Sequence, residues 1–315
     1  MTTLKVVSGR VARPQKAVAY GPEGVGKSTL ASQFPDPVFL DTEGGTHHLD
    51  VVRFPEVSTW DDVTAAVAQL ATGEHGFKTL VIDTADWLEK RLAEHICRKA
   101  NKESIEDFGY GKGYTLLAEE FAKFLASLDA LIRRGMHVVL LAHSTVRKFE
   151  SPDQAGSYDR YELKLTKQVG PLLKEWADLI LFANYVTKVA ESESGRKRGV
   201  GGRERILCTT HAAAYDAKNR HGLDERLPFA FESIARVFGV APAQAVAAPA
   251  KSTADRLADL FNGHEESVKA FLVARSQLKA EGTWTDIPED YALRVLSAPE
   301  RFMQSVAEFK AGGVA

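Results

Sequence analysis

The sequence predicts an α/β protein with a mainly parallel, twisted sheet flanked by helices, followed by a small helical C-terminal module. Short apolar runs alternate with amphipathic helical patterns over residues 1–240, and the first run, 16–20, ends at a glycine-rich turn that opens a helix. An Ala/Pro-rich stretch at 241–250 then precedes a purely helical tail. Strands that alternate with helices favour a parallel sheet covered on both faces.

The strands are predicted from short apolar runs, most of them without a polar face, as expected for strands buried on both sides. The helices are predicted from apolar stripes at helical spacing; in the first long one, Thr59 is a capping residue and Asp61 and Asp62 lie in the first turn. The predicted strands are 16–20, 37–41, 50–54, 78–83, 136–142 and 178–186, followed by strand pairs within 187–220. The predicted helices of this part are 28–34, 59–72, 85–100, 114–134 and 229–239.

The domain organisation follows from the same patterns. We expect an α/β core at 1–240, a linker at 241–252 with no large side chain to bury, and a helical module at 253–315. The module has predicted helices at 253–262, 265–280 and 288–310, the last restarted by Pro299.

Composition limits the function classes. The 315-residue chain is 44% apolar and 26% charged, which excludes wholesale disorder. Its 40 Lys and Arg against 42 Asp and Glu give a net charge of −2, so any nucleic-acid contact must come from local patches. Two cysteines cannot build a disulfide framework and favour a reducing cytosol. No apolar run approaches 18 residues and no signal-peptide core opens the chain, so we expect neither a membrane span nor export.

The strongest motif is a phosphate-binding loop of the pattern GxxxxGK[ST]. Its glycines let backbone N–H groups surround phosphate oxygens, Lys27 reaches the β and γ phosphates, and the Ser28 hydroxyl binds Mg²⁺. Asp83 ends an apolar strand and is the expected second magnesium residue. The sequence therefore predicts ATP and Mg²⁺ as cofactors. The predicted nucleotide-binding residues are Gly21, Pro22, Glu23, Gly24, Val25, Gly26, Lys27, Ser28 and Thr29.

The segments GPEGVGKS, VFLDTEGG, TLVIDTADWL and VVLLAHSTVRK, in this order, resemble the RecA-type recombinase ATPase core over about residues 15–235. Within that group the chain is most similar to the phage RecA-like single-strand annealing proteins. The resemblance implies a DNA-stimulated ATPase that binds single-stranded DNA and promotes annealing or strand exchange in phage recombination or replication. It further implies a homo-oligomer with ATP at subunit interfaces, in the cytoplasm of a phage-infected or host bacterial cell.

The resemblance also implies roles for single residues. Glu43 matches the family's catalytic glutamate, which activates the attacking water, and a solvated strand end is the alternative. His143 stands where the family usually has Gln or Asn as a γ-phosphate sensor, and a simple strand-capping role is the alternative. Lys218 and Arg220 match cations that reach a neighbouring subunit's ATP site, and the alternative is a solvated basic turn.

Three segments are candidate DNA contacts. Aromatic, glycine and basic residues alternate at 108–114, which suits stacking on bases, although a helix-start loop with partly buried tyrosines has the same composition. The stretch 145–168 is predicted to be a long loop that either contacts DNA or forms a mobile lid. The third candidate is the basic tip 196–205, and simple exposed charge is the alternative. The named candidates are Tyr110, Lys112, Tyr114, Arg147, Lys148 and Arg160.

Two other function classes are alternatives. A hexameric DNA motor or helicase loader would use the same ATP site and grip a replication or recombination protein through the C-terminal module. A small-molecule kinase would need a lid with arginines near the phosphate acceptor. His47 and His48 have no partner at metal-ligand spacing, so no zinc site is predicted.

Overall fold

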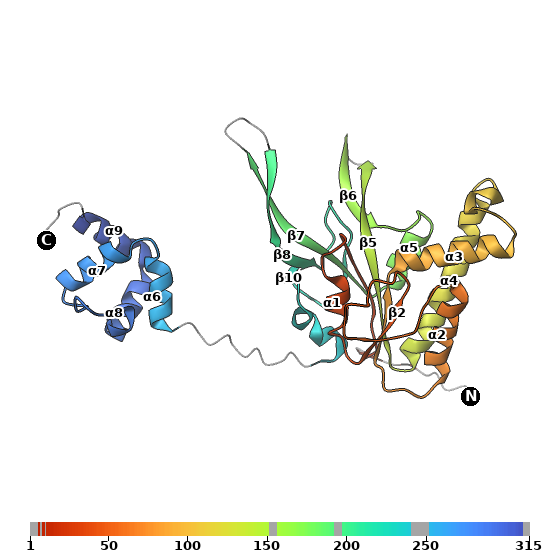
Figure 1. The fold of residues 1–315 in the computed structure, drawn as a ribbon, viewed down its shortest axis with the longest axis horizontal. Helices are drawn as coiled ribbons and strands as arrows, with labels where there is room; N and C mark the ends of the chain where they lie inside the picture. Colours follow the sequence, from red (N-terminus) through yellow and green to blue (C-terminus); the bar gives the residue numbers. More distant parts are fainter. Residues whose placement is uncertain are drawn as a thin grey trace. The chain divides into compact units, whose positions relative to one another are not determined.

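The computed structural model describes residues 6, 8–9, 11–150, 156–191, 197–240 and 252–310, with the backbone alone at 188–191 and 197–201. The chain divides into two compact units, Met1–Pro242 and Ala243–Ala315 (Figure 1). The predicted linker at 241–252 lies outside the described residues except for Ser252.

A mainly parallel sheet forms the larger unit, which confirms the predicted fold class. Its strands run in the order β10-β8-β7-β1-β5-β4-β2-β3, and those from β7 to β3 are parallel neighbours, whereas β8 and β10 continue the sheet in antiparallel pairing. The strands are β1 Lys16–Gly21, β2 Pro37–Asp41, β3 Val52–Arg53, β4 Thr79–Asp83, β5 His137–Glu150, β7 Leu179–Glu191, β8 Lys197–Cys208 and β10 Arg226–Pro228. The register places Asp41 beside Asp83, and Gly21 beside His143, so the carboxyl ends of four strands meet at one edge.

Alternate residues of the strands enter two separate cores. Val18 and Tyr20 of β1 face a large core with α2 Trp60–Thr72, α3 Ala85–Lys99, α4 Lys112–Arg133 and α5 Val169–Trp176. Ala17 and Ala19 face a second core with α1 Lys27–Ala31. The predicted helix at 229–239 is wrong: this segment forms two short 3₁₀ turns, η2 Phe231–Ser233 and η3 Ala235–Phe238, and this path lets both Phe231 and Phe238 pack against Phe34.

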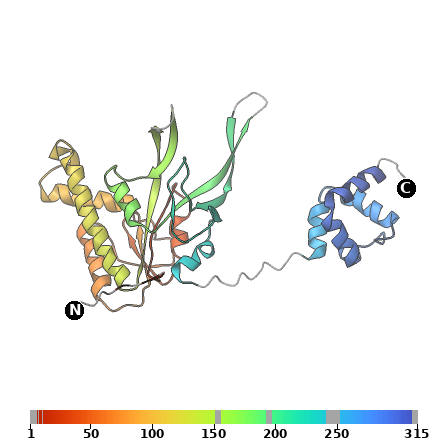
Figure 2. The same ribbon diagram turned by 180° about the vertical axis from the view of Figure 1, so that it is seen from behind.

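The predicted long loop at 145–168 is in large part a β-hairpin. Strand β5 continues past the sheet to Glu150 and pairs with β6 Ser157–Leu163, while residues 151–155 lie outside the described part. Cross-strand pairs such as Phe149 with Tyr158, whose ring centroids are 5.5 Å apart, stabilise this ribbon. The β5–β6 ribbon, the described parts of β7 and β8, and the α3–α4 connection all project from the same side of the sheet (Figures 1 and 2).

The smaller unit is a helical module with its own core around Phe261, Val268 and Phe271. The predicted helix 265–280 ends early, at Ala274, because the chain turns at Ser276 with a left-handed φ of 56°. Pro299 separates the last two helices, as expected for a residue that suits the first helical turn. The elements are α6 Thr253–Phe261, α7 Glu265–Ala274, η4 Trp284–Asp286, α8 Glu289–Ser297 and α9 Pro299–Lys310. Across the described residues, every helix is too short or too polar to cross a membrane.

Candidate nucleotide site

The loop between β1 and α1 has the backbone that a phosphate cradle needs. Gly24 and Gly26 adopt left-handed φ values of 73° and 100°, which L side chains rarely adopt. A Cβ on Gly21 would lie 2.2 Å from the Ala183 carbonyl oxygen, so only glycine fits at the end of β1. Buried Val25 anchors the loop in the core beneath it. The loop therefore leads directly into the N-terminus of α1, where backbone N–H groups have no helical partner.

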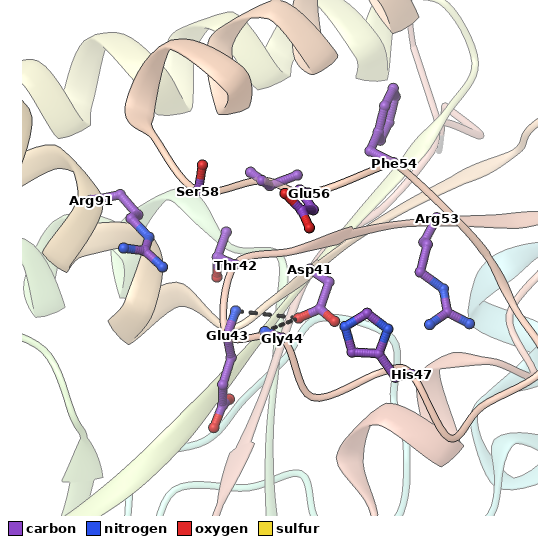
Figure 3. A pocket seen from close by; sticks show the side chains of 11 residues that line it. Asp41, Thr42, Glu43, Gly44, His47, Arg53, Phe54, Glu56, Ser58 and Arg91 are labelled. Atoms are coloured by element: carbon purple, nitrogen blue, oxygen red, sulfur yellow. Dashed lines mark hydrogen bonds between the residues drawn. The ribbon is translucent and has the colours of Figure 1, made fainter.

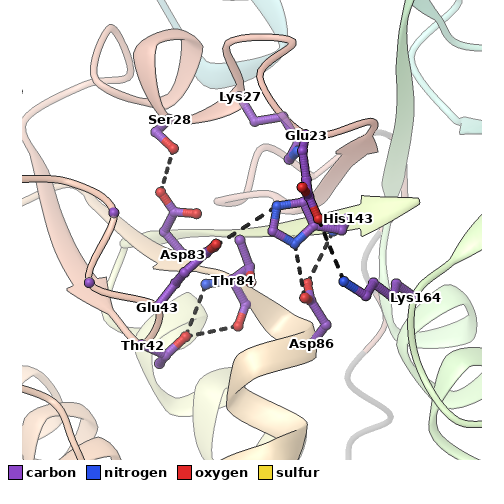
Figure 4. A network of polar contacts seen from close by, with 12 residues as sticks. Glu23, Lys27, Ser28, Thr42, Glu43, Asp83, Thr84, Asp86, His143 and Lys164 are labelled. Atoms are coloured by element: carbon purple, nitrogen blue, oxygen red, sulfur yellow. Dashed lines mark hydrogen bonds and ion pairs between the residues drawn. The ribbon is translucent and has the colours of Figure 1, made fainter. Parts of the chain in front are cut away.

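Lys27, Ser28 and Asp83 meet below this loop (Figure 4). Burial lowers the pKa of Lys27, whose ammonium donates hydrogen bonds to the Gly21 and Pro22 carbonyl oxygens at 3.2 and 3.0 Å. The Ser28 hydroxyl donates to Asp83 at 2.5 Å. Burial, helped by the charge of Asp41 and Glu43, raises the pKa of Asp83 to about 6 against the opposing Ser28 hydrogen bond.

These residues surround a cavity of about 370 Å³, which Lys27, Ser28, Glu43, His48, Asp83 and His143 help to line. The donor set fits Mg²⁺ and a polyphosphate. A hydroxyl and a carboxylate are hard oxygen ligands, and Mg²⁺ usually takes only one or two carboxylates together with phosphate oxygens. Within the described part of the chain, no three His, Cys, Asp or Glu side chains gather as a metal cage of their own. The site therefore suits a metal ion that arrives with its nucleotide.

Asp41 fixes the turn that carries Glu43. The Asp41 carboxylate accepts hydrogen bonds from the backbone of Gly44 at 2.7 Å and from the backbone and hydroxyl of Thr46 at 2.9 and 2.6 Å. Burial opposes ionisation of Asp41, but these hydrogen bonds outweigh it and lower the pKa. The turn after β2 is therefore fixed, and Glu43, with 34% of its side chain exposed, lines both the nucleotide cavity and a neighbouring cavity of about 190 Å³ (Figure 3).

His143 lies opposite Glu43 and is held by Asp86. Its Nδ1 is 2.9 Å from Asp86 Oδ2, its backbone N–H donates to Oδ1 at 3.1 Å, and its Nε2 is 3.9 Å from Glu43 Oε2. Asp86 was missed by the sequence reading because an acidic residue in the first turn of a helix is explained by the helix dipole alone. His48 was considered only as a metal ligand, yet it lines the nucleotide cavity.

The predicted basic tip 196–205 reaches the phosphate loop at its last residue. Arg205 donates a hydrogen bond to the Val25 carbonyl oxygen at 3.0 Å and lies 4.9 Å from the Phe229 ring centroid. Tyr185 donates to the Gly24 carbonyl oxygen at 3.0 Å. Arg205 thus braces the phosphate loop from within β8 Lys197–Cys208, opposite Tyr185, and not from the tip of the hairpin, although it stays exposed. Residue 196 and the side chains of 197–201 lie outside the described part.

The two cations predicted to act on a neighbouring subunit differ in the structure. Lys218 donates hydrogen bonds to the carbonyl oxygens of Lys174, Glu175 and Ala177, so it closes the C-terminal end of α5 and is not a free cation. Arg220 pairs with Asp178 at 2.9 Å but keeps 58% of its side chain exposed. Both belong to the region of β9 Lys218–Asn219, which pairs with the start of β7, at the opposite end of the strands from the phosphate loop.

The predicted DNA residues of the α3–α4 connection separate into two kinds. Tyr110 is fully exposed, and Lys112, the first residue of α4, is exposed beside it. Tyr114 is half-buried against the larger core, and its hydroxyl donates to Glu106 at 3.3 Å. Tyr114 therefore has a packing role, while Tyr110 is available to a ligand.

The β5–β6 ribbon requires one correction. Arg160 is only 7% exposed, forms an ion pair with Asp216 and lies 5.3 Å from the Phe149 ring centroid, so it supports the ribbon and does not fit the predicted DNA contact. Lys148 is exposed, and Arg147 is partly engaged with the Leu165 carbonyl oxygen at 2.8 Å.

A cavity of about 270 Å³ lies between the β5–β6 ribbon and α5. Four cations and one carboxylate line it: Arg147, Lys148, Lys167, Lys174 and Glu162. Glu162 lies 3.6 Å from Arg147, and Lys174 pairs with Asp216 at 2.8 Å, which leaves the exposed Lys148 and Lys167 as the most accessible cations of the cavity. Its charge suits a phosphate group.

Comparison with known proteins adds a family. The model of a family described as AAA domain matches residues 13–221, which include the phosphate loop, Glu43, Asp83 and His143. No curated protein matches the chain in sequence. Among solved structures, a KaiC-like protein from the hyperthermophilic archaeon Pyrococcus horikoshii aligns at 13% identity and a TM-score of 0.38, over 69% of this chain and 85% of that one.

Proposed function

The chain belongs to the AAA domain family, and from this premise we propose that it is a Mg²⁺-dependent ATPase that binds single-stranded DNA. The observation that carries the proposal is the meeting of Lys27, Ser28, Asp83 and Glu43 around one cavity at the carboxyl edge of the sheet. In this assignment Lys27 contacts the β and γ phosphates, Ser28 and Asp83 hold the metal, and Glu43 orients the attacking water. Bound Mg²⁺ neutralises charge on the phosphates.

The DNA part of the proposal rests on how β5 is built. One unbroken strand, His137–Glu150, carries His143 at the nucleotide cavity and Arg147 and Lys148 at the cationic cavity. A shift of His143 on nucleotide binding would be transmitted along this strand to the ribbon. The α3–α4 connection projects from the same side of the sheet (Figure 1), and its exposed Tyr110 and Lys112 offer a stacking surface and a further cation. We propose that single-stranded DNA contacts these two projections and that ATP controls its retention.

We propose that in the cell this protein promotes the annealing or strand exchange of DNA during phage recombination or replication, in the cytoplasm of an infected or host bacterium. The protein would act as a homo-oligomer in which the exposed Arg220 reaches the ATP site of a neighbouring subunit. The separate helical unit would bind a replication or recombination protein.

The test is retention of a fluorescent single strand, measured by anisotropy with ATP, with ADP and without nucleotide. Tighter binding with ATP than with ADP supports the proposal. Equal binding in all three states contradicts nucleotide control, and no binding in any state removes DNA from the function. ATP-driven unwinding of a forked duplex would instead assign the chain to the motor class.

A further inference from the structure

Asp86 makes two separate contacts with His143 (Figure 4). One carboxylate oxygen accepts the backbone N–H at 3.1 Å, and the other lies 2.9 Å from Nδ1 of the ring. Each side chain is 9% exposed, so water competes little for either contact. The carboxylate comes from the first turn of α3 and the ring from β5, 57 residues apart in sequence.

The contact fixes which ring nitrogen holds the proton. Burial opposes ionisation of Asp86, but the hydrogen bonds from His143 outweigh it and lower its pKa, so the carboxylate is ionised at neutral pH. An ionised carboxylate can only accept, and Nδ1 must therefore carry the hydrogen. In the neutral ring Nε2 then has a lone pair and no hydrogen. Nε2 is the atom that lies 3.9 Å from Glu43, in the wall of the nucleotide cavity.

This arrangement conflicts with the sensor role predicted for His143. A Gln or Asn sensor donates a hydrogen bond to the γ-phosphate, whereas a neutral imidazole that has its hydrogen on Nδ1 can only accept at Nε2. A buried carboxylate behind a histidine is instead the arrangement that supports general-base catalysis, since it orients the ring and stabilises the imidazolium that forms.

We propose that Asp86 is a positioning residue that makes His143 Nε2 the acceptor of the proton released by the attacking water. The inference rests on the proposed ATP hydrolysis. An O–H bond of the water breaks as its oxygen bonds to the γ-phosphorus; the bond from that phosphorus to the bridging oxygen breaks, and ADP leaves with that electron pair. The proton bonds to Nε2, either directly or through the Glu43 carboxylate, and the resulting imidazolium lies between the carboxylates of Asp86 and Glu43.

The other charged groups around the cavity leave this assignment intact. Lys27 is engaged with two carbonyl oxygens below the loop, Asp83 accepts from Ser28, and Glu23 lies 3.7 Å from Lys164. Among the described residues, Asp86 and Glu43 are the carboxylates that lie within 4 Å of the His143 ring nitrogens.

The experiment combines a spectroscopic and a kinetic measurement. Nitrogen-15 NMR of the full-length, nucleotide-free protein at pH 8 reports the imidazole tautomer, and His143→Gln identifies the resonance. We expect a proton on Nδ1 alone in the wild type and a loss of this preference in Asp86→Asn. We also expect Asp86→Asn to lower kcat about 100-fold or more while leaving the Kd for ATP within about threefold. Glu94→Gln, on the exposed face of the same helix, is the matched control and should match the wild type in both measurements.

A wild-type ring with its proton on Nε2, or on both nitrogens, overturns the proposal. So does an Asp86→Asn protein that turns over within about twofold of the wild type. Because the tautomer is read without turnover, it decides the role of Asp86 even if Asp86→Asn folds poorly. A wild type that binds ATP and does not hydrolyse it would overturn the proposed function and the proton transfer together, while the NMR result would still decide whether Asp86 positions the ring.

Discussion

The Ser28 hydroxyl donates a hydrogen bond of 2.5 Å to the Asp83 carboxylate across 55 residues of sequence. This contact joins the start of α1 to the end of β4 and places both predicted magnesium residues at one point. The same burial that makes the contact possible disfavours the charged form of Asp83 and raises its pKa to about 6. The site is therefore arranged for a cation, and without one the carboxylate destabilises the fold at neutral pH.

Replacement of Asp83 by Asn should stabilise the nucleotide-free protein above pH 6. Below the unfolded pKa of 3.8 the carboxyl is protonated in both states and has no such effect. As pH rises toward 6 the unfolded chain loses its proton more readily than the folded one, so stability falls by up to about 3 kcal/mol. Urea unfolding of Asp83→Asn and wild type at pH 4 and pH 8 measures this, with a much larger gain expected at pH 8 because the unfolded carboxyl is only partly ionised at pH 4.

Asp41→Asn is the control for that experiment because the pKa of Asp41 is lowered in the folded protein. Its contribution is present above the unfolded pKa and is lost as pH falls, so this variant should be less stable than the wild type at pH 8. If Asp83→Asn also lowers stability at pH 8, the buried carboxylate is not the unfavourable group inferred here.

Replacement of Lys27 by Ala should abolish ATP turnover and leave the fold intact. Among the described residues the ammonium hydrogen-bonds to two carbonyl oxygens of its own loop, so its removal breaks no described hydrogen bond between distant elements. The loss of the phosphate contact should reduce kcat/KM by at least about 100-fold. Steady-state phosphate release measures this. Lys164→Ala, which removes an exposed lysine near Glu23, should keep nearly full activity, and equal losses in both variants would argue against a specific role for Lys27.

Tyr110→Ala should affect DNA binding alone, whereas Tyr114→Ala should affect the stability of the fold. Tyr110 is fully exposed, so its loss should weaken single-stranded DNA binding by about 1–3 kcal/mol without changing the unfolding temperature. Tyr114 packs on the core and bonds Glu106, so its loss should lower the unfolding temperature. Anisotropy titration and thermal unfolding of both variants test this. DNA affinity unchanged in Tyr110→Ala would show that the connection does not hold bases.

Removal of Lys148 and Lys167 should reduce the salt dependence of DNA binding. If both contact phosphates, the slope of log K against log salt should fall by about 0.7 for each. Lys123→Ala is the control, because this lysine pairs with Glu120 on the outer face of α4. A slope that is equal in the double variant and the wild type would remove the cationic cavity from the DNA path.

Sequence reasoning finds those parts of the site whose motifs lie within a few consecutive residues. The phosphate loop and the strand ending at Asp83 each carry their signal within a few residues, whereas Glu43 is predicted only through the family resemblance. The structure brings all three to one cavity. The parallel pairing of the strands, but not their order in the sheet, follows from the alternation of strands and helices.

The missed features are contacts between distant segments. Arg160 with Asp216 and His143 with Asp86 are pairs 56 and 57 residues apart, and neither leaves a periodic trace in the sequence. The polar residues of the β5–β6 ribbon predict a loop. Outside the sheet, cross-strand pairing and not an apolar face stabilises it. The sequence around Lys218 predicts a free cation, because no residue near it in the sequence indicates that α5 ends beside it.

The most direct test of the central claim is the rate of phosphate release by wild type and Glu43→Gln, with and without single-stranded DNA, over a salt series. We predict that DNA stimulates the wild type, that the stimulation fades as salt rises, and that Glu43→Gln binds ATP but hydrolyses it about 100-fold to 10,000-fold more slowly. A wild-type rate that is the same with and without DNA at every salt concentration, or a Glu43→Gln rate equal to that of the wild type, would contradict a DNA-stimulated ATPase that uses this glutamate.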